Sequence, residues 1–244
     1  MASWSRLDVI RLLALSMLLI LPATSGAQQR PPIVEKLAKT YGVESFGQIE
    51  AIRYTFNAQS PRGKSSQSWI WEPKTGRVTY EGKDKSGKPV KVTYLRSQLG
   101  SQSADVKGRI DPGFINDQYW LLLPFHVVWD TSARVEDAGM QKLPLGTGSA
   151  EKVVVKYPAT GGYAPGDTWD LYVGPDGRIQ EFVYHRGDPK KPLVVIAPWA
   201  DYKKAGPLLL SLDHRGTARG KPLHVFFSNV AVKLVGSNTW VDAQ

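Results

Sequence analysis

Short turns between apolar strands constrain the fold of this chain more than any other feature of its sequence. The segments SQSWIWE and RVTYEG flank the turn PKTG, and TWDLYV and RIQEFVYHR flank GPDG. In both turns proline presets φ and glycine accepts a positive φ, which is typical of β-hairpins. Other strand candidates are QIEAIRYTFNA, PVKVTYLRS, EKVVVKYP, LVVIAPWADY, GPLLLSLDH, PLHVFFSNVAVKLV and a short piece around Val127 to Val135. Their connections are too short for parallel crossovers, so the pattern predicts about eleven antiparallel strands.

One amphipathic helix precedes these strands, in the segment PPIVEKLAKTYG. Two prolines suit its start and Gly42 suits its end. Its apolar side chains share one face at helical spacing: Ile33, Val34, Leu37, Ala38 and Tyr41. No linker or change of composition divides the rest of the chain. The sequence therefore predicts one α+β domain over residues 28–244, with helices at the N-terminus and in the middle.

The N-terminus has the layout of a secretory signal peptide. Arg6 and Arg11 precede a ten-residue apolar run, and small residues follow it. A bilayer-spanning helix needs roughly 20 residues, so the run is too short for one. We predict a signal peptide over residues 1–27, cleaved near Ala27, and a mature protein in the periplasm or outside the cell. The chain has no cysteine, which excludes disulfides and a lipid-modified N-terminal cysteine.

The chain carries a formal net charge of +9, and its basic residues are scattered beside Gly, Ser and Pro. No recognition helix or aromatic-basic motif accompanies them, so nucleic acid is not a predicted partner. A basic exported protein is attracted to anionic lipid headgroups, and we expect transient contact with an anionic membrane surface. We expect a monomer.

The segment NDQYWLLLPFHVVWD, Asn116 to Asp130, is the most apolar part of the middle of the chain. Its pattern predicts a short helix that ends at about Leu122 and is broken at Pro124, with FHVVWD leading into a strand. Its length and its polar residues exclude a membrane span. Two interpretations stay open: permanent packing against the sheet, or the wall of a pocket for an apolar ligand.

Catalytic and metal-binding motifs are absent from the sequence. The four histidines form no H-E-x-x-H pair, and neither a cysteine nucleophile nor G-x-S-x-G occurs. Asp167 and Asp170 lie close in the chain, but a strand would turn them to opposite faces. We predict no metal and no cofactor. A periplasmic hydrolase that uses His126 or His185 with a nearby carboxylate is the enzymatic alternative.

Three segments together resemble a group of uncharacterised bacterial exported proteins: INDQYWLLLPF, VVVKYPATGGYAPGDTWDLYVGPDGRIQEFVYHR and WADYKKAGPLLLSLDHRG. The resemblance covers about Phe46 to Val235, and this group is placed with the LolA/LolB-type periplasmic lipoprotein carriers. It implies an open, strongly curved antiparallel half-barrel around short helices, with an apolar cavity for acyl chains. No functional residue of the carriers matches a position here, so the resemblance implies none.

These observations predict a non-enzymatic binding protein for a lipid or an acylated protein. The ligand is expected between the concave sheet and Asn116 to Asp130, with Pro124 as a hinge that lets this segment move as a lid. An interaction scaffold with a solid core is a further alternative. The predicted lining consists of Trp69, Trp71, Tyr119, Trp120, Leu122, Phe125, Trp129 and Trp169.

Overall fold

The computed structural model describes residues 30–244, so the predicted signal peptide, Met1 to Ala27, lies outside the described residues. Helices and strands alternate little along the chain, because one long run of strands is interrupted once by helical segments. The helical elements are α1 (Pro32–Tyr41), η1 (Val43–Gln48), η2 (Arg96–Ser101), η3 (Val106–Ile110) and α2 (Asp111–Trp129). The strands are β1 (Ile49–Ser60), β2 (Gly63–Glu72), β3 (Arg77–Lys83), β4 (Pro89–Leu95), β5 (Arg134–Lys142), β6 (Ser149–Lys156), β7 (Thr168–Val173), β8 (Ile179–His185), β9 (Val194–Pro198), β10 (Ala200–Ala205), β11 (Leu208–Ala218), β12 (Lys221–Leu234) and β13 (Trp240–Asp242).

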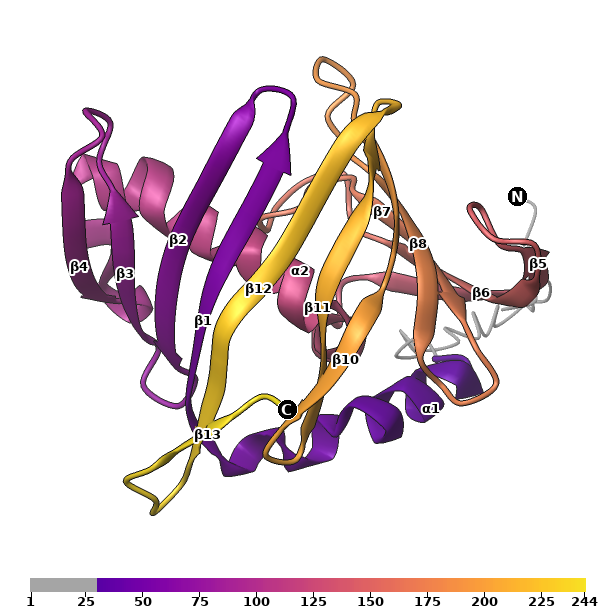
Figure 1. Ribbon diagram of the computed structural model, residues 1–244, viewed down its shortest axis with the longest axis horizontal. Coiled ribbons are helices and arrows are strands. Elements are labelled where there is room, and N and C mark those ends of the chain that lie inside the picture. Colours follow the sequence, from indigo (N-terminus) through magenta and orange to yellow (C-terminus); the bar gives the residue numbers. More distant parts are fainter. Residues whose placement is uncertain (1–29) are drawn as a thin grey trace, which may run out of the picture.

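All thirteen strands belong to one antiparallel sheet. Eleven of them follow the order β4-β3-β2-β1-β12-β11-β9-β8-β7-β6-β5, while β10 pairs with β11 and β13 with β12. The path begins at β4 and ends at β5, and no described pairing closes it into a barrel. The sheet curves around α2, and α1 lies across its lower end (Figure 1). The predicted α+β class and the open, curved antiparallel sheet with covering helices are confirmed.

The two hairpins predicted from turn chemistry are confirmed in register. Trp71 pairs with Val78 across the β2–β3 hairpin, and Leu171 pairs with Phe182 across the β7–β8 hairpin. The segment LVVIAPWADY forms two strands, β9 and β10, because Trp199 separates them.

The first helix, α1, is held on the sheet by a tyrosine pair. The Tyr41 hydroxyl lies 2.7 Å from that of Tyr202 and accepts the backbone N–H of Ile179 on β8. Gly42 ends the helix at φ 76°, where a Cβ would lie 2.3 Å from the carbonyl oxygen of Pro207. Positive φ and this close approach both require glycine there.

The second helix, α2, differs from the prediction. It continues past Pro124 to Trp129, so FHVVW is helical and Asp130 caps the helix, Val127 is not in a strand, and the next strand begins at Arg134. The backbone leaves helical geometry at Leu122 (φ −115°, ψ 20°), within the turn that precedes the proline. The helix is therefore kinked rather than broken.

A buried histidine explains why the helix tolerates the proline. Pro124 has no N–H to donate to the carbonyl of Trp120, four residues earlier. Instead, Nε2 of His214, on β11, lies 3.2 Å from that carbonyl oxygen. Burial lowers the pKa of His214 to about 4, so its ring is neutral at neutral pH and can donate one N–H. The other ring nitrogen, Nδ1, lies 3.4 Å from the carbonyl oxygen of Pro198, so the single N–H is assigned to Nε2, which lies nearer to its acceptor. With this assignment the carbonyl that the proline leaves unpaired is satisfied from the sheet.

Carboxylates fix α2 against strands at two further points. Asp111, fully buried, accepts hydrogen bonds from the Tyr94 hydroxyl (2.9 Å) and from Nε of Arg96 (3.0 Å). Asp117, 1% exposed, accepts a hydrogen bond from Nε1 of Trp69 on β2 (2.8 Å). Apolar side chains of α2, most of them beyond Asp117, fill the concave face: Phe114, Trp120, Leu121, Leu122, Leu123, Phe125 and Val127. No helix within residues 30–244 has the length and apolar character needed to span a bilayer.

A double-mutant cycle tests the role of His214. His214→Leu should lower the free energy of unfolding by about 2 kcal/mol, because the buried carbonyl of Trp120 loses its donor. Pro124→Ala supplies a backbone N–H to the same carbonyl, so the loss should shrink by about 1 kcal/mol in that background. Urea unfolding of the four proteins measures this coupling. Equal losses in both backgrounds would show that His214 does not compensate the proline.

A pH series tests the buried carboxylate of Asp117. Burial raises its pKa to about 6, although Gln67, Asn116 and Trp69 donate hydrogen bonds to it. The folded protein thus holds this proton more tightly than the unfolded chain, and the resulting stability is lost as the pH rises from about 4 to about 6. His214 has the opposite effect: its pKa is lowered from 6.5 to about 4, so its contribution to stability is lost as the pH falls.

The two effects offset each other in the wild type, and Asp117→Asn removes one of them. The unfolding free energy of this variant should rise relative to that of the wild type by on the order of 3 kcal/mol between about pH 4 and about pH 6. Urea unfolding at several pH values measures the difference. A difference that does not change with pH would contradict a raised pKa at Asp117.

Candidate functional site

A cleft of about 360 Å³ lies between the first half of α2 and two loops, 157–167 and 186–193. The loops connect β6 to β7 and β8 to β9, so both lie at the same end of the sheet. Its lining combines α2, the two loops and the ends of β7 and β8: Pro112, Ile115, Asn116, Tyr119, Trp120, Tyr163, Ala164, Pro165, Asp167, Trp169, Tyr184, Arg186, Asp188 and Leu193.

Aromatic rings form the inner wall of this cleft. The ring centroid of Trp169 lies 5.7 Å from that of Trp120 and 4.6 Å from that of Tyr184. Nε1 of Trp169 is buried and has no hydrogen-bond partner within residues 30–244. Buried polar groups are normally paired. The wall therefore offers a large apolar surface and one unused donor.

Polar side chains stand at the outer edge of the cleft. Asp167 accepts hydrogen bonds from the Tyr184 hydroxyl and from the backbone N–H of Gly187, both at 2.8 Å. Burial, and then the neighbouring Asp167 carboxylate, raise the pKa of Tyr184 to about 12. Arg186 is exposed at the same edge. The cleft thus has an apolar interior and a charged mouth.

The hydroxyl of Tyr163 holds loop 157–167 against the start of α2. The Tyr163 hydroxyl donates to Oδ2 of Asp111 (2.7 Å) and accepts from Arg96 (3.0 Å). Gly161 and Gly162 in this loop have φ of 81° and 66°, which glycine adopts without strain. The cleft is therefore covered by a glycine-rich loop that polar contacts hold in place.

Three of the eight residues predicted as lining meet in this cleft: Tyr119, Trp120 and Trp169. The structure does not bring the other five to it. Leu122 and Phe125 are fully buried under α2, and Trp69 is bound to Asp117.

Trp71, on β2, and Trp129, the last residue of α2, both pack on the ring of Phe46. The cleft residues of the two loops, such as Tyr163, Arg186 and Leu193, were not among the predicted lining residues. The unusual sequence YPATGGYAPGD, with an aromatic residue among glycines and prolines, was the available signal for the first loop.

His126, on α2, belongs to a buried polar cluster beside the cleft. Its Nδ1 lies 3.2 Å from Oδ2 of Asp130, and its ring stacks on Tyr119 at 3.9 Å. Nε2 of His126 is buried without a partner among the described residues. Burial raises the pKa of Asp130, but hydrogen bonds from His126, Tyr119 and Tyr157 outweigh it and lower the pKa overall.

The other candidate residues for catalysis are dispersed. His185 is 45% exposed in its side chain and lies 3.8 Å from Asp170, which also pairs with Lys152 at 2.8 Å. His214 is buried, while its chain neighbour Asp213 contacts His224. Within residues 30–244 no group of three His, Asp or Glu side chains has the geometry to hold a metal ion.

No protein family matches the sequence, and no curated protein is significantly similar to it. The chain is similar in structure to a DUF1329 family protein from Desulfovibrio piger, with 8% identity, coverage of 85% of this chain and 95% of that one, and a TM-score of 0.45. It is also similar to a domain from Vibrio parahaemolyticus described as an outer membrane lipoprotein-sorting protein (8% identity, 87% and 95% coverage, TM-score 0.47). A third likeness is to the Mycobacterium tuberculosis lipoprotein LppX (8% identity, 87% and 99% coverage, TM-score 0.30).

The Vibrio domain is of the lipoprotein-sorting kind that the sequence resemblance named. All three TM-scores are below 0.5, so the fold class rests on the sheet and helices described above. These likenesses carry no argument about function.

Proposed function

We propose that this protein is an exported, non-enzymatic binding protein that holds an acyl chain, either of a lipid or of a lipidated partner. The observation that carries the proposal is the cleft beside α2, with its wall of Tyr119, Trp120 and Trp169. Its volume of about 360 Å³ lies within the range of small-molecule sites, roughly 300–1,000 Å³.

Apolar burial supplies the binding energy in this proposal. Each methylene moved from water into the cleft contributes about 0.8 kcal/mol, so a chain of several methylenes gains enough to offset the entropy lost on binding. The mouth holds charges of both signs, Arg186 together with Asp167 and Asp188, and this polar edge suits the polar end of such a ligand. An acyl chain fits this division between interior and mouth better than a uniformly polar solute does.

The five predicted lining residues that lie outside the cleft contact a ligand in this proposal only if α2 moves away from the sheet. Phe125 and Leu122 are fully covered by their neighbours, so a ligand reaches them when α2 moves away from the sheet. The kink at Leu122 is the point in α2 where such a movement would begin.

The hydrolase alternative has one supporting observation, the contact of His126 with Asp130. An imidazole oriented by a carboxylate is a general base when its other nitrogen reaches a nucleophile or substrate. His126 is 8% exposed and is not part of the cleft lining. Binding without catalysis therefore remains the proposal that the cleft supports best.

Filling the cleft tests the location of the ligand. Ala164→Trp places a large side chain in the cleft from loop 157–167, and it should weaken binding of a fluorescent fatty acid at least about tenfold because the two compete for the same volume. Ala159→Trp is the matched control, since Ala159 is exposed in the same loop and outside the lining. Fluorescence titration measures both variants. Equal binding by Ala164→Trp and the wild type would exclude this cleft.

Native mass spectrometry tests whether the protein carries a ligand at all. Protein purified without detergent from its own cell envelope should show, beside the mass of the chain, a second species heavier by one acyl-bearing molecule. The adduct should be lost after extraction with organic solvent and regained on addition of lipid. A single ligand-free species that takes up no lipid would favour the scaffold alternative.

A further inference from the structure

The antiparallel path places five loops at one end of the sheet. Since neighbouring strands run in opposite directions, their connections alternate between the two ends. The turns β1–β2, β3–β4 and β11–β12 are spread along the upper end of the molecule (Figure 1). We call this end the basic rim and define it by the segments 61–64, 83–88, 157–167, 186–193 and 219–221.

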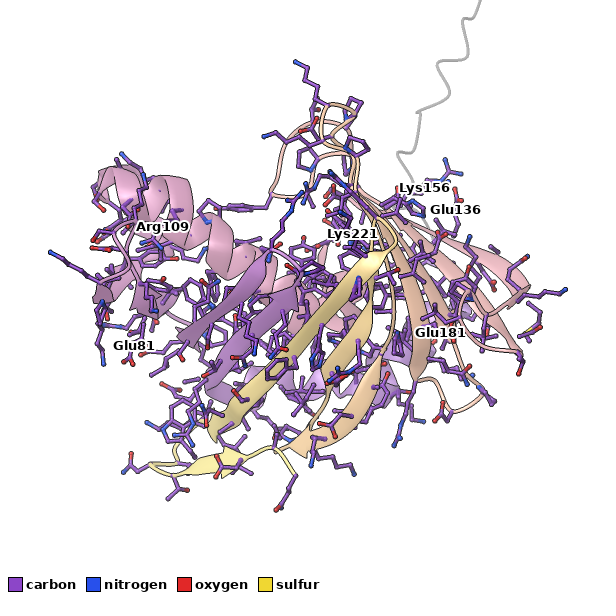
Figure 2. All side chains as sticks on the ribbon, turned by 45° about the horizontal axis from the view of Figure 1, so that its top comes forward. Glu81, Arg109, Glu136, Lys156, Glu181 and Lys221 are labelled. Carbon is purple, nitrogen blue, oxygen red and sulfur yellow. The ribbon has the colours of Figure 1, made fainter. Side chains whose placement is uncertain are left out.

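The basic rim holds most of the net charge of the protein. Its segments contain ten basic and three acidic side chains, a net charge of +7, against a formal net charge of +9 for the whole chain. All ten basic residues are exposed: Arg62, Lys64, Lys83, Lys85, Lys88, Arg186, Lys190, Lys191, Arg219 and Lys221. Lys221 marks the rim at the start of β12 (Figure 2).

These ten residues form no salt bridges with residues 30–244, whereas several basic residues elsewhere do. Lys91 pairs with Glu81, Arg134 with Glu136 and Lys152 with Asp170. The turns of the opposite end with their adjoining strand residues, 72–77, 142–149, 173–179, 204–208 and 234–240, contain five basic and two acidic residues, a net charge of +3. Positive charge is therefore higher at the rim, and because it forms no salt bridge with the described residues it can meet an external partner.

The form of the rim indicates the kind of partner. Its basic side chains come from four separate loops rather than from one pocket, so they suit a broad anionic surface. A polar cleft of about 450 Å³ is lined by residues of β1, β2, β3, β12 and η3, among them Lys64, Lys83 and Arg109, and it offers space for a phosphate-bearing headgroup. Tyr163, 50% exposed on the same rim, is a residue type enriched at membrane interfaces.

The basic rim and the mouth of the acyl cleft coincide. Loops 157–167 and 186–193 belong to the rim and also line the cleft, and Arg186 contributes to both. A flat anionic surface that contacts the rim therefore lies next to the cleft. We propose that the basic rim docks this protein on a bilayer containing anionic phospholipids, with the mouth of the cleft directed at the lipid. This inference goes beyond the proposed function, because docking by the rim does not require a ligand in the cleft.

Sedimentation with lipid vesicles tests the docking. The wild type should bind vesicles of one-third phosphatidylglycerol and two-thirds phosphatidylcholine, and should not bind vesicles of phosphatidylcholine alone. Binding should disappear at about 1 M salt, where the Debye length is about 3 Å. Each basic residue near an anionic surface contributes roughly fivefold to the partition constant. Reversing Lys64, Lys191 and Lys221 to Glu should therefore weaken binding at least about 100-fold.

A triple variant at the other end is the matched control. Lys74→Glu, Lys142→Glu and Lys204→Glu change the net charge by the same amount at exposed lysines that lie outside the rim and form no described salt bridge. This variant should bind vesicles within about threefold of the wild type, a smaller effect than loss of one rim contact. Equal weakening by both triples would show that overall charge, rather than the rim, is responsible, and would overturn the proposal.

Two further measurements distinguish membrane docking from acyl binding and from binding of an acidic protein. The rim triple should bind a soluble fatty acid as the wild type does, so a failure of acyl binding and a failure of docking are distinguishable. Retention of the wild type on immobilised polyglutamate, together with no binding to anionic vesicles, would overturn the membrane proposal and indicate an acidic protein as partner.

Discussion

The hydrogen bond between His214 and the carbonyl of Trp120 allows one long helix to cross the concave face of the sheet. Pro124 would otherwise leave that carbonyl unpaired in the core, which costs about 1–3 kcal/mol. His214 occupies the right place because β11 passes directly beneath the kink, 94 residues along the chain from Trp120. Its neutral ring satisfies the carbonyl without placing a charge in the core.

Once α2 is held on the concave face, its two buried carboxylates determine which part of that face keeps space for a ligand. Asp117 binds it to β2, and Asp111 binds its start to β4 and to loop 157–167 through Tyr94 and Tyr163. The second half of α2 packs into the sheet without space for a ligand, since Phe125 is fully buried. The first half packs on β2 on one side and faces loops 157–167 and 186–193 on another, and loops of irregular shape pack less completely. The cleft is a consequence of this asymmetry.

The sequence predicted those structural features that depend on residues close together in the chain. The two hairpins, for example, follow from the turns PKTG and GPDG. The continuation of α2 beyond Pro124 was not predictable locally, because it depends on His214, distant in the chain. For the same reason the pattern could not separate Trp120, which lines a cleft, from Trp69, which is bound in the core. That distinction requires the paths of loops 157–167 and 186–193, and glycine- and proline-rich segments have no periodicity from which a path could be read.

Charge and cleft share one end of the molecule for a topological reason. In a sheet of consecutive antiparallel strands, every second connection reaches the same end, so residues from distant parts of the sequence gather there. The helix α1 covers the opposite end, where Tyr41 and Tyr202 close the sheet against it (Figure 1). Exposed side chains on the loops at the uncovered end pack against no other element, so these positions can carry unpaired lysines and arginines without loss of stability. The scattered basic residues of the sequence thus become one surface through folding, and that surface borders the opening through which an acyl chain would enter.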